Sequence, residues 1–306
     1  MSRLRQWRQG AEYQAVRGAL FLAGSLPLGI TRAFGAAVGT LAFALRIRRE
    51  VSVDNIVRGL GLTPREATRI ARRSYQNLGR SFMEFAAQRR WSQNDVLELV
   101  HLDGMEHIRH ALEAGRGAIM VSGHFGNWET AGAALRGSGL PLSFLVGEQT
   151  NGRVDDVIND LRRAQQIGII TRASALKKVL TALRNNEVIA LLADQDARKA
   201  GVVVEFLGRP ASTVRGPAMF AIRADCPIVP FSIRRDGKAF MATVEPALWP
   251  DPALDEEASV VALTQGYTDA LARAVRAHPE EYFWPHRRWK STSSQATRSQ
   301  GATGAA

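Results

Sequence analysis

The chain has 306 residues, of which 45% are hydrophobic and 23% charged, so it can bury the core of one large or two small domains and is not a disordered protein. Its one cysteine, Cys226, excludes an internal disulfide and a cysteine-rich zinc site. Residues 1–90 hold 16 arginines, no lysine and five acidic residues, and so carry the entire net charge of +11.

Residues 1–50 contain eight of these arginines and the most apolar stretch of the chain, 19–45. A basic and apolar segment is typical of one that binds an anionic membrane surface. Pro27 and Arg32 interrupt the stretch, and a spanning helix needs about 20 apolar residues, so it does not predict a clean membrane span. Because arginines flank it on both sides and no cleavage site follows it, we expect retention on the cytoplasmic face of a membrane. The alternative is a helical hairpin packed on the domain.

Nucleic acid is the other partner that arginine richness favours. No zinc-ligand set, aromatic RNA-binding motif or helix-turn-helix pattern accompanies the charge, so we do not expect nucleic-acid binding.

Residues 51–290 predict one domain that alternates helices and strands. A capping box at Thr63–Glu66, with proline at the first helical position, opens a helix that continues through Phe85. The later elements are expected as helices over 106–114, 127–137, 154–166 and 174–184 and strands over 118–122, 141–146, 167–171 and 188–193. The alternation predicts an α/β fold with a largely parallel central sheet flanked by helices.

The C-terminal part adds a strand pair and a closing helix. Residues 227–233 and 239–244 are expected to pair as a hairpin around Asp236-Gly237, and 256–277 as a helix. Residues 291–306 are rich in Ser, Thr, Gln, Gly and Ala, so we expect a disordered tail.

An imidazole and a carboxylate follow the strand at 118–122, in Gly123-His124-Phe125-Gly126-Asn127-Trp128-Glu129. His124 and Glu129 cannot share a helical face, but they can meet across a strand-to-helix turn that the glycines allow and Asn127 caps. Glu129 would then fix the tautomer of His124, which becomes a general base for a hydroxyl. The alternative is a solvated strand-end histidine beside an ordinary first-turn glutamate.

This stretch and several blocks in the same order resemble the bacterial lipid A biosynthesis acyltransferases, the lauroyl/myristoyl transferase branch of the lysophospholipid acyltransferase superfamily. The other blocks are Asp103–His107, Gly115–Gly117, Asp194–Asp196, Val204–Thr213 and Tyr282–Lys290, so the resemblance covers roughly residues 15–290. It implies a glycerolipid acyltransferase-like fold, catalysis by His124 and Glu129, and an N-terminal segment that holds the enzyme to the cell inner membrane.

The resemblance also implies a substrate-binding arginine on the helix after Asn151. The spacing favours Arg162 over Arg163, and a guanidinium suits the phosphate of a polar head group. A solvated helix-face arginine is the alternative. Just upstream, Gly147-Glu148-Gln149-Thr150 departs from the arginine-containing stretch usual in the lipid A branch, which leaves the acceptor open.

Two further groups are candidate substrate-binding residues. Asp194 and Asp196 follow a buried strand, where one carboxylate can position the loop near His124 or organise a polar head group. A metal would need more ligands than this pair, so we expect none. Gly208 and Arg209 lie in the block that lines the pocket in the family, where arginine and backbone N–H groups can hold phosphate. A Gly/Pro turn between a strand and a helix is the alternative.

The C-terminal block, from Trp284 to Lys290, alternates aromatic and basic residues. Such a cluster suits a membrane interface, but packing of both indoles against the core is an equal alternative.

Together these features predict a membrane-associated O-acyltransferase. The resemblance implies acyl carrier protein as the donor, with acyl-CoA as an alternative thioester, no other cofactor, and a glycolipid such as a lipid A precursor as the acceptor. A phosphatidylinositol mannoside or a lysophospholipid is the alternative acceptor within the superfamily. A non-catalytic membrane-bound scaffold is the alternative outside enzymes.

Overall fold

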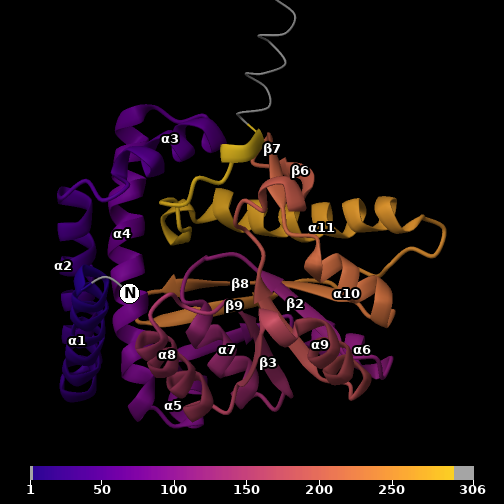
Figure 1. Ribbon diagram of the computed structural model, residues 1–306, viewed down its shortest axis with the longest axis horizontal. Coiled ribbons are helices and arrows are strands. Elements are labelled where there is room, and N and C mark those ends of the chain that lie inside the picture. Colours follow the sequence, from indigo (N-terminus) through magenta and orange to yellow (C-terminus); the bar gives the residue numbers. More distant parts are fainter. Residues whose placement is uncertain (1–2, 293–306) are drawn as a thin grey trace, which may run out of the picture.

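The computed structural model describes residues 3–292 and has a seven-stranded sheet with helices on both faces (Figure 1). The strand order is β1-β9-β8-β2-β5-β3-β4. The strands from β8 to β4 run parallel to one another, whereas β8 and β9 are antiparallel and β9 pairs in parallel with β1. The prediction of an α/β fold with a largely parallel sheet is therefore confirmed.

The helices and strands follow one another along the chain with short connections. Their bounds are α1 Arg3–Ser25, α2 Leu28–Ala44, α3 Arg49–Leu60, α4 Pro64–Ala87, α5 Gln93–Leu99, β1 Val100–Asp103, α6 Met105–Glu113, β2 Ala118–Ser122, α7 Trp128–Gly137, β3 Leu142–Val146, α8 Gly152–Ala164, β4 Gly168–Thr171, α9 Ala175–Arg184, β5 Val188–Leu192, β6 Val202–Phe206, β7 Arg209–Thr213, α10 Gly216–Ala224, β8 Ile228–Asp236, β9 Ala239–Val244 and α11 Glu256–Ala277.

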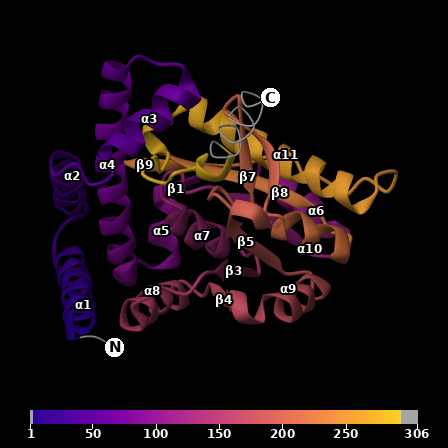
Figure 2. The same cartoon turned by 45° about the horizontal axis from the view of Figure 1, so that its top comes forward.

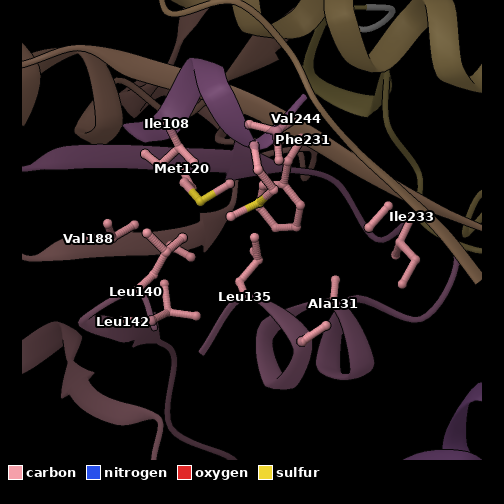
Figure 3. Close-up of a cluster of buried hydrophobic side chains, with 14 of the residues drawn as sticks. Ile108, Met120, Ala131, Leu135, Leu140, Leu142, Val188, Phe231, Ile233 and Val244 are labelled. Carbon is pink, nitrogen blue, oxygen red and sulfur yellow. The ribbon is translucent and has the colours of Figure 1, made fainter. Parts of the chain in front are cut away.

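The sheet forms because its central strands are buried on both faces. Every residue of β2 is buried, as its continuous apolar sequence requires in a parallel sheet. Helices α5, α6 and α7 cover one face, where Ala131 and Leu135 of α7 pack toward Met120 (Figure 3). Helices α9, α10 and α11 cover the other face. The sheet therefore lies between two apolar layers.

The N-terminal helices lie outside the sheet layers. Helix α4 stands between the sheet and the pair formed by α1 and α2, and Figure 2 shows the same order from another side. Helix α2 approaches α4 very closely, because a side chain on Gly39 or Gly79 would collide with the backbone of the other helix. Helices α1 and α2 are thus packed on the domain.

No single helix in residues 3–292 is long and apolar enough to cross a membrane. Helices α2 and α3 taken together are long and apolar enough for a membrane span, but they are bent by 91° relative to each other. Membrane association of residues 1–50 therefore stays a prediction.

Several predicted elements agree with the structure and some were missed. The hairpin of β8 and β9 and the helix over 256–277 are present, and Asn127 caps α7 through its side chain. The strands β6 and β7 were not predicted, and Gly208 lies in the turn between them rather than between a strand and a helix. Most of the predicted tail, residues 293–306, lies outside the described residues.

Candidate active site

The site lies where two neighbouring strands end. Strands β2 and β5 are parallel, with Ser122 opposite Leu192, so the residues that follow them meet at the same edge of the sheet. His124 and Asp194 lie two residues after the ends of β2 and β5. The Nδ1 atom of His124 lies 2.7 Å from Oδ1 of Asp194, and the backbone N–H of His124 donates to Oδ2 at 3.0 Å.

Both members of this pair have shifted pKa values. Burial opposes charge on Asp194, yet the imidazole and the backbone N–H of His124, with the Arg288 guanidinium, lower the pKa of its carboxyl to about 2. Burial also disfavours the imidazolium, but Asp194 and, less strongly, Glu129 leave the pKa of His124 raised above its usual value. Asp194 is therefore a permanent carboxylate that orients the ring and stabilises its protonated form.

The expected hydrogen bond between His124 and Glu129 needs correction, because Asp194 occupies the Nδ1 side of the ring. Glu129 lies in the first turn of α7, as predicted, and accepts from Arg162 through both oxygens, at 2.6 and 3.0 Å. The indole N–H of Trp128 donates to the same carboxylate at 3.2 Å. The Arg162 to Glu129 pair is largely buried, with side chains 13% and 8% exposed. The catalytic role of Glu129 and the substrate-binding role of Arg162 stay predictions.

The C-terminal block contacts the loop that carries His124. Tyr282 bridges Phe125 in antiparallel fashion, the N–H of Phe283 donates to the carbonyl of His124 at 2.9 Å, and the N–H of Gly126 donates to the carbonyl of Glu281 at 2.8 Å. Gly126 has a φ of +61°, and a Cβ there would lie 1.7 Å from the carbonyl oxygen of Ile233. The second glycine of the motif is therefore required by both conformation and packing.

A small cavity adjoins the imidazole. Its volume is about 10 Å³, room for about one water molecule, and it is lined by Ser74, Asn77, Leu78, His124, Gly126, Trp128, Glu281, Tyr282 and Phe283. Two aromatic rings flank His124, with centroids 5.0 Å away for Trp128 and 5.9 Å for Phe283. The imidazole thus lies between two aromatic rings, beside a cavity whose lining also includes the polar Ser74, Asn77 and Glu281.

Sequence analysis missed Glu281 and Tyr282 as neighbours of the site. Burial raises the pKa of Glu281 to about 7 and, together with the nearby Asp194, raises the pKa of Tyr282 well above its usual value. Their place after the closing helix gave no local signal, because long-range contacts with the loop after β2 and with α4 bring them to the cavity.

The remaining predicted residues lie away from the imidazole pair in the structure. Asp196 accepts hydrogen bonds from Ser291, and its own N–H donates to Nε2 of His286 at 2.9 Å. Gly208 has a φ of +78° in the turn between β6 and β7, and Arg209 lies over the ring of Trp289. None of the three predicted residues lines the cavity at His124, and their substrate-binding role stays a prediction.

The C-terminal aromatic and basic residues pack inward. Trp284 and Trp289 are buried, as is Arg288, which donates to the carbonyl of Ser212 at 2.6 Å. Of the two alternatives for this block, packing against the core is confirmed for both indoles.

A wider groove lies between α3 and the start of α4. It has about 1020 Å³ of empty space, open solvent included, and is lined by residues such as Arg46, Arg49 and Val53. It contains none of the predicted site residues.

The sequence of the chain is similar to those of several known proteins. The family model described as bacterial lipid A biosynthesis acyltransferase matches residues 3–291. The lipid A biosynthesis lauroyltransferase of Escherichia coli (strain K12) is 27% identical over 283 residues, which cover 90% of each chain. The phosphatidylinositol mannoside acyltransferase of Mycobacterium tuberculosis (strain ATCC 25618 / H37Rv) is 28% identical over 204 residues, which cover 65% of this chain and 63% of that protein.

Two further relatives carry the same kinds of name. The phosphatidylinositol mannoside acyltransferase of Mycolicibacterium smegmatis is 24% identical over 257 residues, and the lipid A biosynthesis palmitoleoyltransferase of Escherichia coli is 22% identical over 280 residues. The match to the Mycobacterium tuberculosis relative spans a little less than two thirds of its length, whereas the family model spans nearly all of this chain. The chain therefore belongs to the bacterial lipid A biosynthesis acyltransferase family, a family of acyltransferases.

Proposed function

We propose that this protein transfers a fatty acyl chain from a thioester to a hydroxyl group of a membrane lipid, with His124 as the general base. Nε2 of His124 takes the proton of the hydroxyl while its oxygen attacks the thioester carbonyl carbon. The tetrahedral intermediate then collapses, the carbon–sulfur bond breaks, and the imidazolium returns its proton to the departing thiolate. The products are an ester and a free thiol, and no acyl-enzyme forms.

One observation carries the proposal, the hydrogen bond of 2.7 Å between Nδ1 of His124 and Asp194. A carboxylate at Nδ1 keeps the proton of the neutral ring on that atom, so that Nε2 has a free lone pair for the hydroxyl. Asp194 also stabilises the imidazolium that forms after proton transfer. In this proposal Asp194 takes the orienting role that the sequence assigned to Glu129.

Helix α7 supplies the second part of the mechanism. Its first residue, Trp128, is only four positions after His124, so the N–H groups of its first turn and the positive end of its dipole lie beside the reacting carbonyl. The Asn127 side chain already accepts from the N–H of Thr130, so we assign the N–H groups of Trp128 and Glu129 to the oxyanion of the tetrahedral intermediate. The Glu129 to Arg162 pair fixes this turn, and Arg162 remains the candidate for the polar head of the lipid.

The donor and the acceptor are proposed at the level of chemical class. Acyl carrier protein is the donor that we favour, with acyl-CoA as the alternative. A glycolipid such as a lipid A precursor and a phosphatidylinositol mannoside are both candidate acceptors, because relatives named for each match this chain. Mass spectrometry of the lipids in a strain that lacks the protein separates them, since one lipid class should lose an acyl chain.

The place of action that we propose is the cytoplasmic face of the inner membrane. Helix α2 and the residue that caps its C-terminus expose large apolar side chains, including Ile30 and Leu41 of the helix and the cap Leu45, which are 54%, 58% and 64% exposed. Large apolar patches on a protein surface mark sites of contact with membranes or partners. Arg46 and Arg48, which are exposed just beyond the helix, can meet lipid phosphate.

Acyl transfer by a His124→Ala variant tests the function. The variant should transfer acyl groups from a thioester to a panel of lipid acceptors at least about a hundredfold more slowly than the wild type, because a general base contributes that much. His110→Ala is the matched control, since His110 is exposed and pairs only with Glu113 on its own helix. Equal rates for wild type and His124→Ala would contradict the assignment of the base. Binding to liposomes with no turnover of any donor by the wild type would favour the scaffold.

A further inference from the structure

Helix α4 holds the start of α7 through polar side chains on one of its faces. Ser81 donates to the carbonyl of Gly126 at 3.3 Å. The amide of Gln88 donates to the hydroxyl of Thr130 at 2.7 Å. Seven residues separate Ser81 from Gln88, so the two side chains lie on the same face of α4, about two turns apart. This face therefore contacts the chain just before and just after the N-cap of α7, which is Asn127.

Glu84 is the charged residue of this face. Its side chain is fully buried and accepts a hydrogen bond from Nδ2 of Asn127 at 2.9 Å. Nε of Arg32 donates to the same carboxylate at 2.6 Å, and Arg235 donates to both of its oxygens at 2.5 and 2.7 Å. The two guanidinium groups compensate the buried charge, which would otherwise be costly. The position of the carboxylate is thus set by α2 and β8, independently of Asn127.

The carboxylate of Glu84 decides which way the amide of Asn127 points. A carboxylate only accepts hydrogen bonds, so the NH2 group of Asn127 must face it. The oxygen of the same amide is then left to accept from the N–H of Thr130 at 3.2 Å, which caps α7. A reversed amide would place its NH2 group against that N–H and leave the helix uncapped. Because Asn127 is buried, solvent does not replace the lost cap.

We propose that Glu84 is a positioning residue of the acyl transfer, because it fixes the Asn127 cap and with it the first turn of α7 beside His124. The inference rests on the proposed function, in which the N–H groups of Trp128 and Glu129 stabilise the oxyanion. The directions of those two N–H groups depend on the turn that Asn127 caps. Since the oxyanion develops only in the transition state, a displaced turn should lower kcat and leave KM nearly unchanged.

Asn127→Asp tests the role of the N–H group that faces Glu84. Aspartate caps a helix about as well as asparagine, but its carboxylate has no hydrogen for Glu84. Two carboxylates in contact share one proton at low pH, and that proton restores the missing donor, whereas at higher pH both are ionised and repel each other. The ratio of the kcat of Asn127→Asp to that of the wild type should therefore fall at least about tenfold as the pH rises from about 5 to about 9.

The other charged groups around this pair are the same in both proteins. Arg32, Arg80 and Arg235 keep their charge over this range of pH. His124 and Glu281, whose pKa burial raises to about 7, titrate in the variant as in the wild type. The ratio of the two rates therefore reports the new carboxylate.

The reversed pair, Glu84→Gln with Asn127→Asp, gives the rescue. Glutamine supplies the N–H group, aspartate accepts it, and one carboxylate remains for Arg32 and Arg235. Most of the kcat that Asn127→Asp loses at high pH should return, and the dependence of the ratio on pH should disappear.

Asn151→Asp is the matched control. Asn151 is the buried N-cap residue of α8, and its amide donates to the carboxylate of Glu12 at 3.2 Å. The substitution creates the same contact between two carboxylates at the start of a different helix. It should keep the kcat of the wild type at every pH.

Hydrogen exchange of α7 gives a readout that needs no turnover. In the full-length protein without substrate, the backbone N–H groups at the start of α7 should exchange faster in Asn127→Asp than in the wild type at high pH. The reversed pair should return their exchange to the rate of the wild type.

The proposal is wrong if the kcat ratio of Asn127→Asp does not depend on pH, if the reversed pair recovers nothing, or if Asn151→Asp loses as much. Faster exchange of α7 with an unchanged kcat would also overturn it, because Glu84 would then support only the fold. The expected exchange pattern in a wild type that transfers no acyl group to any acceptor would keep the role of Glu84 in capping α7 and refute the proposed function.

Discussion

At the scale of single residues, the site contains two buried carboxylates that have different main partners. Asp194 is fixed by His124, and Glu129 is fixed by Arg162. The sequence placed His124 and Glu129 near one edge of the sheet, because the residue types and the strand-to-helix turn are local. It did not show which carboxylate would reach Nδ1, because that depends on which strand lies next to β2. The order β2-β5 brings Asp194 there from 70 positions along the chain.

The Glu129 to Arg162 pair makes a prediction about stability. Glu129→Ala leaves a largely buried guanidinium without its carboxylate, so we expect the free energy of unfolding to fall by about 3 kcal/mol or more. Urea unfolding followed by circular dichroism measures it. Asp160→Ala, which breaks the exposed pair of Asp160 with Arg163, is the control and should cost less than about 1 kcal/mol. Equal losses in both variants would show that burial of the first pair has no energetic consequence.

At the scale of elements, strands and helices with strong local signals were predicted well. The capping box at Thr63 and Glu66 forms as expected, and the apolar run of β2 is a fully buried strand. The hairpin of β6 and β7 was missed, because Pro210 and Gly208 indicate a turn and the pairing of the flanking residues is tertiary information. The helices α3, α5 and α10 were also missed, since they are short and their apolar faces are brief.

The contact between α2 and α4 makes a prediction at this scale. In Gly39→Ala the new methyl group would lie 2.0 Å from the carbonyl oxygen of Tyr75, so the helices must move apart. We expect a loss of about 1–3 kcal/mol in the free energy of unfolding, as for other overpacked contacts.

Gly29→Ala is the matched control in the same helix. A Cβ there has nothing within 4 Å, so the better helix propensity of alanine should leave stability unchanged or raise it by up to about 1 kcal/mol. A Gly39→Ala variant as stable as Gly29→Ala would contradict the close packing of α2 on α4.

At the scale of the whole molecule, charge and apolar surface are concentrated in the N-terminal part. Helices α1 to α4, which carry most of the arginines of residues 1–90, lie outside the sheet, and α2 has a row of exposed apolar side chains. The sequence showed this concentration directly, since it is a matter of composition. It did not show that one side of α2 is occupied by α4 and the other exposed, because the glycines that allow the contact have no apolar signal.

Binding to vesicles tests this arrangement. The full-length protein should float with vesicles that contain anionic phospholipid, and replacing both Leu41 and Leu45 by serine should weaken binding at least about tenfold, because both exposed side chains lose apolar contact with the bilayer. Val203→Ser is the control, since Val203 is an exposed apolar residue on β6, away from α2. An equal loss in the control, or no binding by the wild type, would contradict a membrane surface on α2.

The pH dependence of acyl transfer in Asp194→Asn tests the central claim most directly. The reaction needs neutral His124, and the Asp194 carboxylate raises the pKa of that ring, so the rate of the wild type should fall as the pH drops through the raised pKa. Removing the carboxylate lowers this pKa. In Asp194→Asn the acid limb of the kcat/KM profile should therefore move to lower pH, and the maximum should fall at least about a hundredfold, as when a general base loses its orienting partner. An unshifted acid limb in Asp194→Asn, together with a shifted one in Glu129→Gln, would contradict the account.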